Sequence, residues 1–155
     1  MRWVTRWGPA LVWAAVISSF STSLFTAENT SRVIVPILHW IFPHASPTTL
    51  FEMHHLIRKS AHFIEYFILS LLILRGIRGE KRELHLRWAL IAILIVAGYA
   101  SLDELHQAFV PGRTAAVTDV LLDTTGGAAA QIVTALFVLW SRVRDRRRES
   151  VVSST

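Results

Sequence analysis

Histidine, carboxylate and arginine side chains recur at helical spacing in short stretches of this chain. Arg58, His62 and Glu65 are four and three residues apart, so they would share one face of a helix. Asp103 and Gln107 are also four residues apart. An imidazole held by a carboxylate can act as a general acid or base, and arginine matches the oxygens of a phosphate group with paired donors. These stretches therefore indicate a site for an anionic group, with proton transfer as one available chemistry.

The candidate site residues come from these stretches and from the segments that follow them. The catalytic candidates are His62, Glu65 and Asp103, and the substrate-binding candidates are Arg58, Lys59, Glu104, Gln107, Arg113, Asp119 and Asp123. Asp103, Asp119 and Asp123 could also hold a divalent cation that assists phosphoryl chemistry. No other cofactor is expected, because the chain lacks cysteine and the motifs of zinc and serine hydrolases.

The elements that must position these residues are membrane helices. Hydrophobic residues make up 52% of the 155 residues and charged residues only 17%, which argues against a disordered chain or an ordinary soluble domain. A helix needs about 20 mostly apolar residues to span the hydrocarbon layer. Four stretches qualify, at about 7–25, 61–77, 86–102 and 119–140. Residues 33–42 are too few to cross, and we expect them to form an interfacial or re-entrant segment.

Basic residues predict the orientation of this bundle. Most of the 16 Lys and Arg residues precede the first apolar stretch, lie between the second and third, or follow the fourth. Cytoplasmic loops carry such an excess, so both termini are predicted to be cytoplasmic. The fold class is therefore an all-α integral membrane bundle of four transmembrane helices, with residues 1–148 as one domain and 149–155 as a disordered cytoplasmic tail. A cleaved signal peptide at the start is the less favoured alternative.

The polar candidates gather at one end of this predicted bundle. Ser46 and Pro47 predict the start of a helix that continues to Arg75 and carries its polar residues in its outer half. The third and fourth stretches also have their carboxylates at their outer ends. Gly126 and Ala130 share a stripe with Asp123 and would let another helix approach closely. We therefore expect one polar pocket at the external boundary of the membrane.

The same residues have a purely structural interpretation. Arg58, Lys59 and Arg113 could neutralise carboxylates and hold helix ends together without any chemistry. The centre of the cluster is expected at His62, Asp103 and Arg113. However, five acids (Glu65, Asp103, Glu104, Asp119 and Asp123) outnumber these three permanent cations. The excess indicates a protonated acid, a bound cation, a charged histidine or acids exposed to water. Crowded carboxylates beside basic groups are also typical of functional sites.

The motifs together resemble the VanZ-like family. The carriers of the resemblance are K-x-x-H-F-x-E-Y from Lys59, D-E-x-x-Q-x-F-x-P-G-R from Asp103 and D-x-x-x-D-x-x-G from Asp119. Asp123 stands where many relatives have Asn, and Ala130 where many have Gly. The resemblance implies a multi-pass protein of the bacterial cytoplasmic (inner) membrane with four helices. The family takes its name from a protein associated with resistance to the glycopeptide teicoplanin.

Three functions are compatible with these observations. The first is an enzyme or binding protein for a lipid-linked component of the cell envelope, reached from the outer leaflet, with membrane lipids, anionic or isoprenoid-linked, as partners. The second is a non-enzymatic membrane factor whose polar cluster is an ion-pair network. The third is a small proton- or cation-coupled transporter. Nucleic acid is not expected as a partner, because the basic run after residue 140 flanks a membrane helix and no aromatic stacking motif accompanies it. The oligomeric state stays open.

Overall fold

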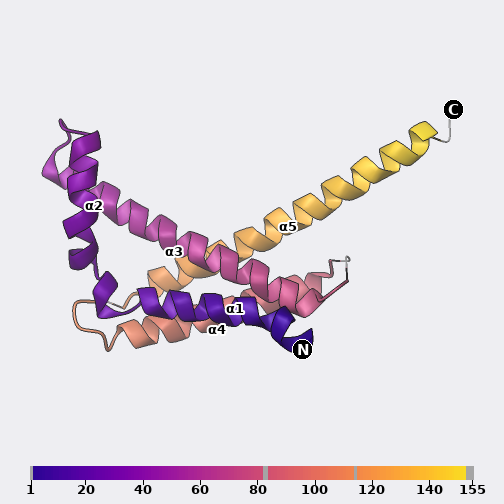
Figure 1. Cartoon of the computed structure of the whole chain (residues 1–155), viewed down its shortest axis with the longest axis horizontal. Helices are drawn as coiled ribbons and strands as arrows, with labels where there is room; N and C mark the ends of the chain where they lie inside the picture. The colour runs from indigo at the N-terminus through magenta and orange to yellow at the C-terminus, as the bar shows by residue number, and fades with distance from the viewer. Residues whose placement is uncertain (1, 82–83, 114, 153–155) are drawn as a thin grey trace.

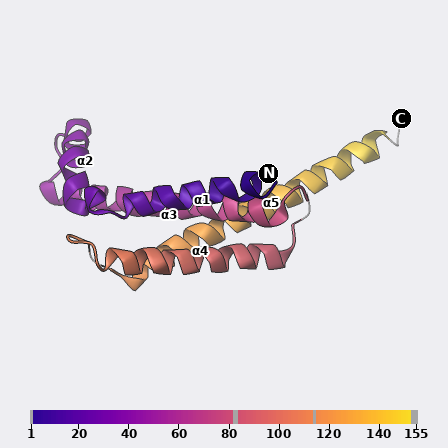
Figure 2. The same cartoon turned by 60° about the horizontal axis from the view of Figure 1, so that its bottom comes forward.

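The computed structural model describes residues 2–81, 84–113 and 115–152. Within them the chain forms five α-helices and one short 3-10 helix, and no strand. Their bounds are α1 Arg2–Phe20, η1 Ser23–Phe25, α2 Ala27–Ile41, α3 Pro47–Arg78, α4 Leu86–Gln107 and α5 Val117–Val152. Helices α1, α3 and α4 run along one another, α5 crosses them and projects beyond the bundle, and α2 turns away at the far end (Figures 1 and 2).

The described helices fit a membrane protein. Three of them, within Pro47–Arg78, Leu86–Gln107 and Val117–Arg146, are long and apolar enough to cross a bilayer. A fourth span is added if α1 and the η1–α2 segment count together as one broken span. Large apolar side chains face outward on these helices, as shown by Leu94, which is 69% exposed, and Leu136, which is 61% exposed. The all-α membrane bundle is confirmed with three to four candidate spans, and its orientation stays a prediction.

A sharp elbow separates α1 from α2. The chain direction changes by 64° between the two segments Trp3–Phe20 and Ser23–Ile41. The first apolar stretch predicts a helix that continues to residue 25, whereas α1 ends at Phe20 because the chain bends at Ser21 and Thr22. The expected short segment at 33–42 is instead a 15-residue helix that starts at Ala27 and continues through Pro36. Thr26 caps that helix by accepting a hydrogen bond from the Asn29 amide.

The other helix ends follow local chemistry. Ser46 caps α3 and Pro47 occupies its first turn, as predicted, and the helix continues three residues past Arg75. The helix stops at Gly79, whose φ of 59° is readily adopted only by glycine. Arg6 of α1 donates hydrogen bonds to the carbonyls of Gly76 and Ile77 in the last turn. Helix α5 continues to Val152, four residues into the predicted tail, and residues 153–155 lie outside the described residues.

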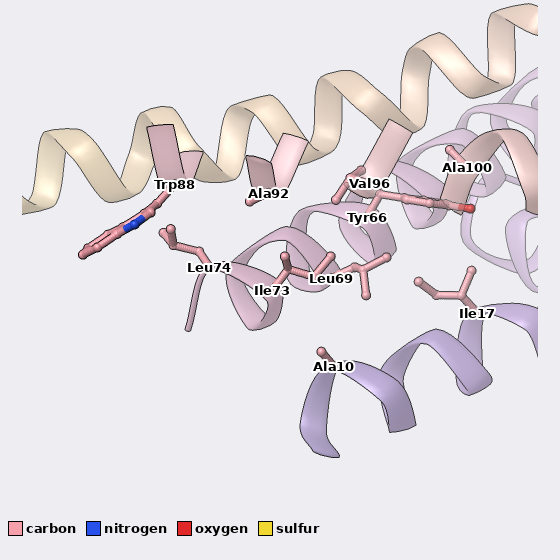
Figure 3. Packing of buried hydrophobic residues seen from close by; sticks show 10 residues of the cluster. All are labelled: Ala10, Ile17, Tyr66, Leu69, Ile73, Leu74, Trp88, Ala92, Val96 and Ala100. Carbon is pink, nitrogen blue, oxygen red and sulfur yellow. The ribbon is translucent and has the colours of Figure 1, made fainter. Parts of the chain in front are cut away.

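The apolar core joins three helices. Ala10 and Ile17 of α1 point toward Leu69 and Ile73 of α3, and α4 closes the cluster with residues from Trp88 to Ala100 (Figure 3). Tyr66 is completely buried, with its hydroxyl directed toward the α4 end that carries Asp103. The core therefore extends from the apolar half of the bundle to the polar end.

Candidate functional site

Two adjoining cavities lie at the elbow end of the bundle. The apolar cavity has a volume of about 230 Å³ and is lined by Phe20, Phe25, Thr30, Ile34, Ile57, Arg58, Ala61, His62, Glu65 and Arg113. The basic cavity has a volume of about 140 Å³ and is lined by Ala27, His55, Arg58, Lys59, His62, Gln107, Gly112, Arg113, Asp119 and Leu122. Arg58, His62 and Arg113 line both cavities, so these three side chains form the boundary between them.

The basic cavity has an excess of positive charge. Its lining contains three permanent cations, Arg58, Lys59 and Arg113, and a single carboxylate, Asp119. The apolar cavity adds one further carboxylate, Glu65. The other three acids of the cluster line neither cavity, so the surplus of acids in the sequence does not extend to the cavity walls.

The two arginines bind the elbow. The Nη1 atom of Arg58 donates to the Phe25 carbonyl and to Thr30 Oγ1, both at 2.9 Å. Nη2 of Arg113 donates to the carbonyls of Phe20, Thr22 and Phe25. Phe20 and Phe25 are the last residues of α1 and η1, and Thr22 lies in the turn between them. Carbonyl groups at such positions lack partners within a helix. Both guanidiniums therefore contact the Phe25 carbonyl and fix the position of α2.

The acceptors that these arginines use are neutral. Among the described residues neither Arg58 nor Arg113 forms a direct ion pair with a carboxylate. Burial lowers the pKa of Arg113 from its ordinary value, and the neighbouring charge of Arg58 lowers it further. An anion placed between the two guanidiniums would counter both effects.

Asp103 and Arg113 are connected through Gln107. Arg113 Nη1 donates to Gln107 Oε1 at 2.9 Å, and Gln107 Nε2 donates to Asp103 Oδ2 at 3.0 Å. The same carboxylate oxygen accepts hydrogen bonds from Ser21 Oγ at 2.7 Å and from the Tyr66 hydroxyl at 3.3 Å. Asp103 is only 5% exposed, and its hydrogen bonds join α1, α3 and α4.

A second group of ionisable side chains is far less satisfied. His62 Nδ1 lies 3.9 Å from Glu65 Oε2 and 3.9 Å from Asp123 Oδ1. Within the described residues, His62 Nδ1 and Asp123 Oδ1 are buried without a hydrogen-bond partner. Asp123 itself is 3% exposed. This arrangement places one imidazole edge against two carboxylates.

Close packing of α3 and α5 creates that arrangement. A Cβ atom on Gly126 would lie 2.4 Å from the Phe63 carbonyl oxygen, so only glycine fits at this point. Phe63 follows His62 directly in the sequence, and Asp123 precedes Gly126 by three residues, which is close to one helical turn. The predicted close approach at Gly126 is therefore present, and it brings Asp123 to the imidazole.

The remaining candidates are distributed around these groups. Lys59 and Asp119 line the basic cavity. Glu104 is buried and its Oε1 accepts a hydrogen bond from the Ala116 amide, which fixes the loop before α5. The possible divalent-cation site of Asp103, Asp119 and Asp123 is not assembled, since no group of three His, Asp or Glu in the described part of the chain is placed to hold a metal ion.

Three residues of this end were missed by sequence reasoning. Ser21 is almost fully buried and donates a hydrogen bond to Asp103 Oδ2. The Tyr66 hydroxyl donates to the same carboxylate oxygen. Thr30 Oγ1 accepts from Arg58 and lies 3.1 Å from His54 Nε2. Tyr66 belongs to the H-F-x-E-Y motif, which was a usable signal. Ser21 and Thr30 resemble the other hydroxyl residues of 18–31, and only the elbow distinguishes them.

A protein-family model matches most of this chain. The VanZ/LLP1 family model matches residues 7–139, which include the described helices from α1 into α5 and every candidate residue. The chain belongs to the VanZ/LLP1 family. No curated protein and no solved structure matches it. Together with the three to four candidate spans, the family membership makes this a multi-pass membrane protein.

Proposed function

We propose that this VanZ/LLP1 member binds an anionic, lipid-linked component of the cell envelope at the outer leaflet of the bacterial inner membrane. The headgroup occupies the basic cavity and the first part of the lipid tail occupies the apolar cavity. The observation that carries the proposal is the unbalanced lining of the basic cavity, with three permanent cations and one carboxylate. A guanidinium pair with neutral partners is suited to a phosphate group, whose oxygens accept from both.

The apolar cavity supports an amphiphilic ligand over a free anion. Phe20, Phe25, Ile34 and Ile57 supply apolar walls directly beside Arg58 and Arg113. Apolar surface removed from water stabilises a bound state by about 25 cal/mol per Å², so a lipid tail would add affinity that a free phosphate lacks. The elbow between α1 and α2 and the face of α3 would therefore hold both parts of one molecule.

Lipid retention measured by native mass spectrometry tests this proposal. The purified protein should retain phosphatidic acid in preference to phosphatidylcholine. The double substitution Arg58→Gln with Lys59→Gln should lower that retention about tenfold, which corresponds to loss of one charged hydrogen bond. The matched control is Arg32→Gln on α2, because Arg32 is exposed and its partner is Glu28, one turn earlier on the same helix. Equal retention of both lipids, or equal loss in the control, would reject the proposal.

The outer-leaflet location is a separate part of the proposal and rests on the distribution of basic residues. A cysteine introduced at Ser46, in the loop beside the elbow, should react with an impermeant thiol reagent in intact cells. A cysteine introduced at Lys81, in the opposite loop, should react only after the cells are opened. The reverse labelling would move the site to the cytoplasmic side.

We further propose an effect on glycopeptide susceptibility, supported by the family membership. Expression in a Gram-positive host should raise the inhibitory concentration of an acylated glycopeptide such as teicoplanin more than that of a glycopeptide without an acyl chain. The acyl chain partitions into the outer leaflet, where the cavities are proposed to open. Equal or absent shifts would contradict this effect without affecting lipid binding.

A further inference from the structure

We propose that His62 is a general base that activates water for hydrolysis of a lipid pyrophosphate bound in the basic cavity, and that Asp123 positions its ring. This inference rests on the proposed lipid binding and adds a reaction to it. His62 belongs to both cavity walls, beside the two guanidiniums that would hold the phosphates. Asp123 lines neither cavity, and its Oδ1 lies 3.9 Å from Nδ1 of His62.

The two edges of the imidazole have different surroundings. Nδ1 is buried and faces Glu65 and Asp123, each at 3.9 Å. The side chain as a whole is 25% exposed, so its accessible part is the edge away from Nδ1. Carboxylates at Nδ1 favour the tautomer with the proton on that nitrogen, which leaves the lone pair on Nε2. The basic nitrogen is then the one that faces the cavities.

The separation of 3.9 Å is longer than a direct hydrogen bond. One bridging water would satisfy the buried Nδ1 and Oδ1 atoms together, and catalytic contacts commonly shorten when substrate is bound. The side chains of Asp123 and Glu65 are 4% and 14% exposed, so both carboxyl groups are held beside the ring with little contact with solvent. Oδ2 of Asp103, by contrast, is already engaged by three donors.

The reaction step balances without another co-reactant. The water oxygen attacks the terminal phosphorus while one of its protons passes to Nε2 of His62. The bond from that phosphorus to the bridging oxygen breaks, and its electron pair stays on the bridging oxygen. The products are inorganic phosphate and the lipid monophosphate, and His62 returns its proton to solvent. Because a phosphate leaving group is stable as an anion, Arg58, Lys59 and Arg113 can neutralise it without a separate acid.

Phosphate release from farnesyl pyrophosphate by the purified full-length protein tests this inference. Wild type should release inorganic phosphate, and His62→Gln should lower the rate about 100-fold while membrane yield and retention of the pyrophosphate stay within about twofold. His44→Gln, an exposed histidine outside both cavities, should match wild type. Asp123→Leu should lower kcat with an unchanged KM. Asp123→Asn should restore most of kcat, because its amide oxygen can accept from Nδ1 through the same bridging water as the carboxylate.

The possible results distinguish failure of the proposed hydrolysis from failure of the proposed lipid binding. Retention of the pyrophosphate by wild type with no phosphate release would overturn the hydrolysis and leave lipid binding standing. Failure to retain the pyrophosphate or phosphatidic acid would overturn both. Full activity of His62→Gln would remove the imidazole from the reaction. If Asp123→Leu raised KM and left kcat unchanged, the positioning role would be wrong.

Discussion

Asp103 and Asp123 are two buried carboxyl groups at the same end of the bundle, and they differ in how many hydrogen bonds they accept. One oxygen of Asp103 accepts from Ser21, Tyr66 and Gln107. Oδ1 of Asp123 is buried with no hydrogen-bond partner among the described residues, and the imidazole of His62 lies 3.9 Å from it. The first carboxylate connects three helices, whereas the second faces a side chain that lines two cavities.

The difference separates structure from chemistry within one polar cluster. Hydrogen bonds to a buried charge stabilise a fold only when the charge is well satisfied, and an unsatisfied buried charge costs stability. Asp103 has the features of a structural group, so we now propose it as a junction between helices and not as a catalytic residue. Oδ1 of Asp123 is buried without a hydrogen-bond partner among the described residues, and ionisable groups in such surroundings are typical of functional sites.

The largest predicted effect is on the Asp103 junction. Asp103→Ala should lower the free energy of unfolding by about 3 kcal/mol, because it leaves buried donors of Ser21, Tyr66 and Gln107 without an acceptor. Thermal unfolding in detergent, followed by helical circular dichroism, measures the loss. A variant with unchanged stability that no longer retains lipid would reverse the roles given to the two carboxylates.

An intermediate effect is expected at Gly126, which sets the distance between Asp123 and His62. Gly126→Ala should destabilise the protein by about 1–3 kcal/mol, as overpacking does, since the new Cβ would meet the Phe63 carbonyl at 2.4 Å. Lipid retention should fall as α3 and α5 separate. The matched control is Gly98→Ala in α4, where an added Cβ meets nothing within 4 Å and a neutral or slightly stabilising change is expected. Equal losses at both glycines would show that the close approach does not matter.

The smallest effect on stability is expected at Asp123 itself. Asp123→Asn replaces a buried, poorly satisfied carboxyl group by an amide of the same shape, so stability should change by less than about 1 kcal/mol or rise slightly. The same unfolding measurement, run beside Asp145→Asn on the exposed part of α5, checks this expectation. A loss as large as that of Asp103→Ala would mean that both carboxylates are structural.

The membrane class and most helix positions could be predicted from the sequence, because apolar stretches of sufficient length and the Ser46–Pro47 cap are local signals. The close approach at Gly126 was also predictable from the stripe of small residues. The elbow was not, since the break at Ser21 and Thr22 depends on carbonyls that accept from Arg113, more than 80 residues away. A proline inside a helix usually breaks it, yet α2 continues through Pro36.

The composition of the site was predictable in part, and its connectivity was not. Helical spacing placed Arg58, His62 and Glu65 on one face, and all three line the apolar cavity. Spacing within a helix says nothing about which residue of another helix is opposite, so the order Arg113–Gln107–Asp103 and the contact of His62 with Asp123 required the packed structure.

Photo-cross-linking of a bound lipid tests the central claim, that an anionic amphiphile occupies the two cavities at the elbow. The probe is a phosphatidic acid with a photoreactive group in its acyl chain, and the labelled residues are mapped by mass spectrometry. We expect labelling to concentrate on the apolar cavity, at Ile34, Ile57 and Ala61, and to be lost when Arg58 and Lys59 are both changed to Gln. Labelling spread evenly over the exposed faces of α4 and α5, or unchanged in that variant, would contradict the account.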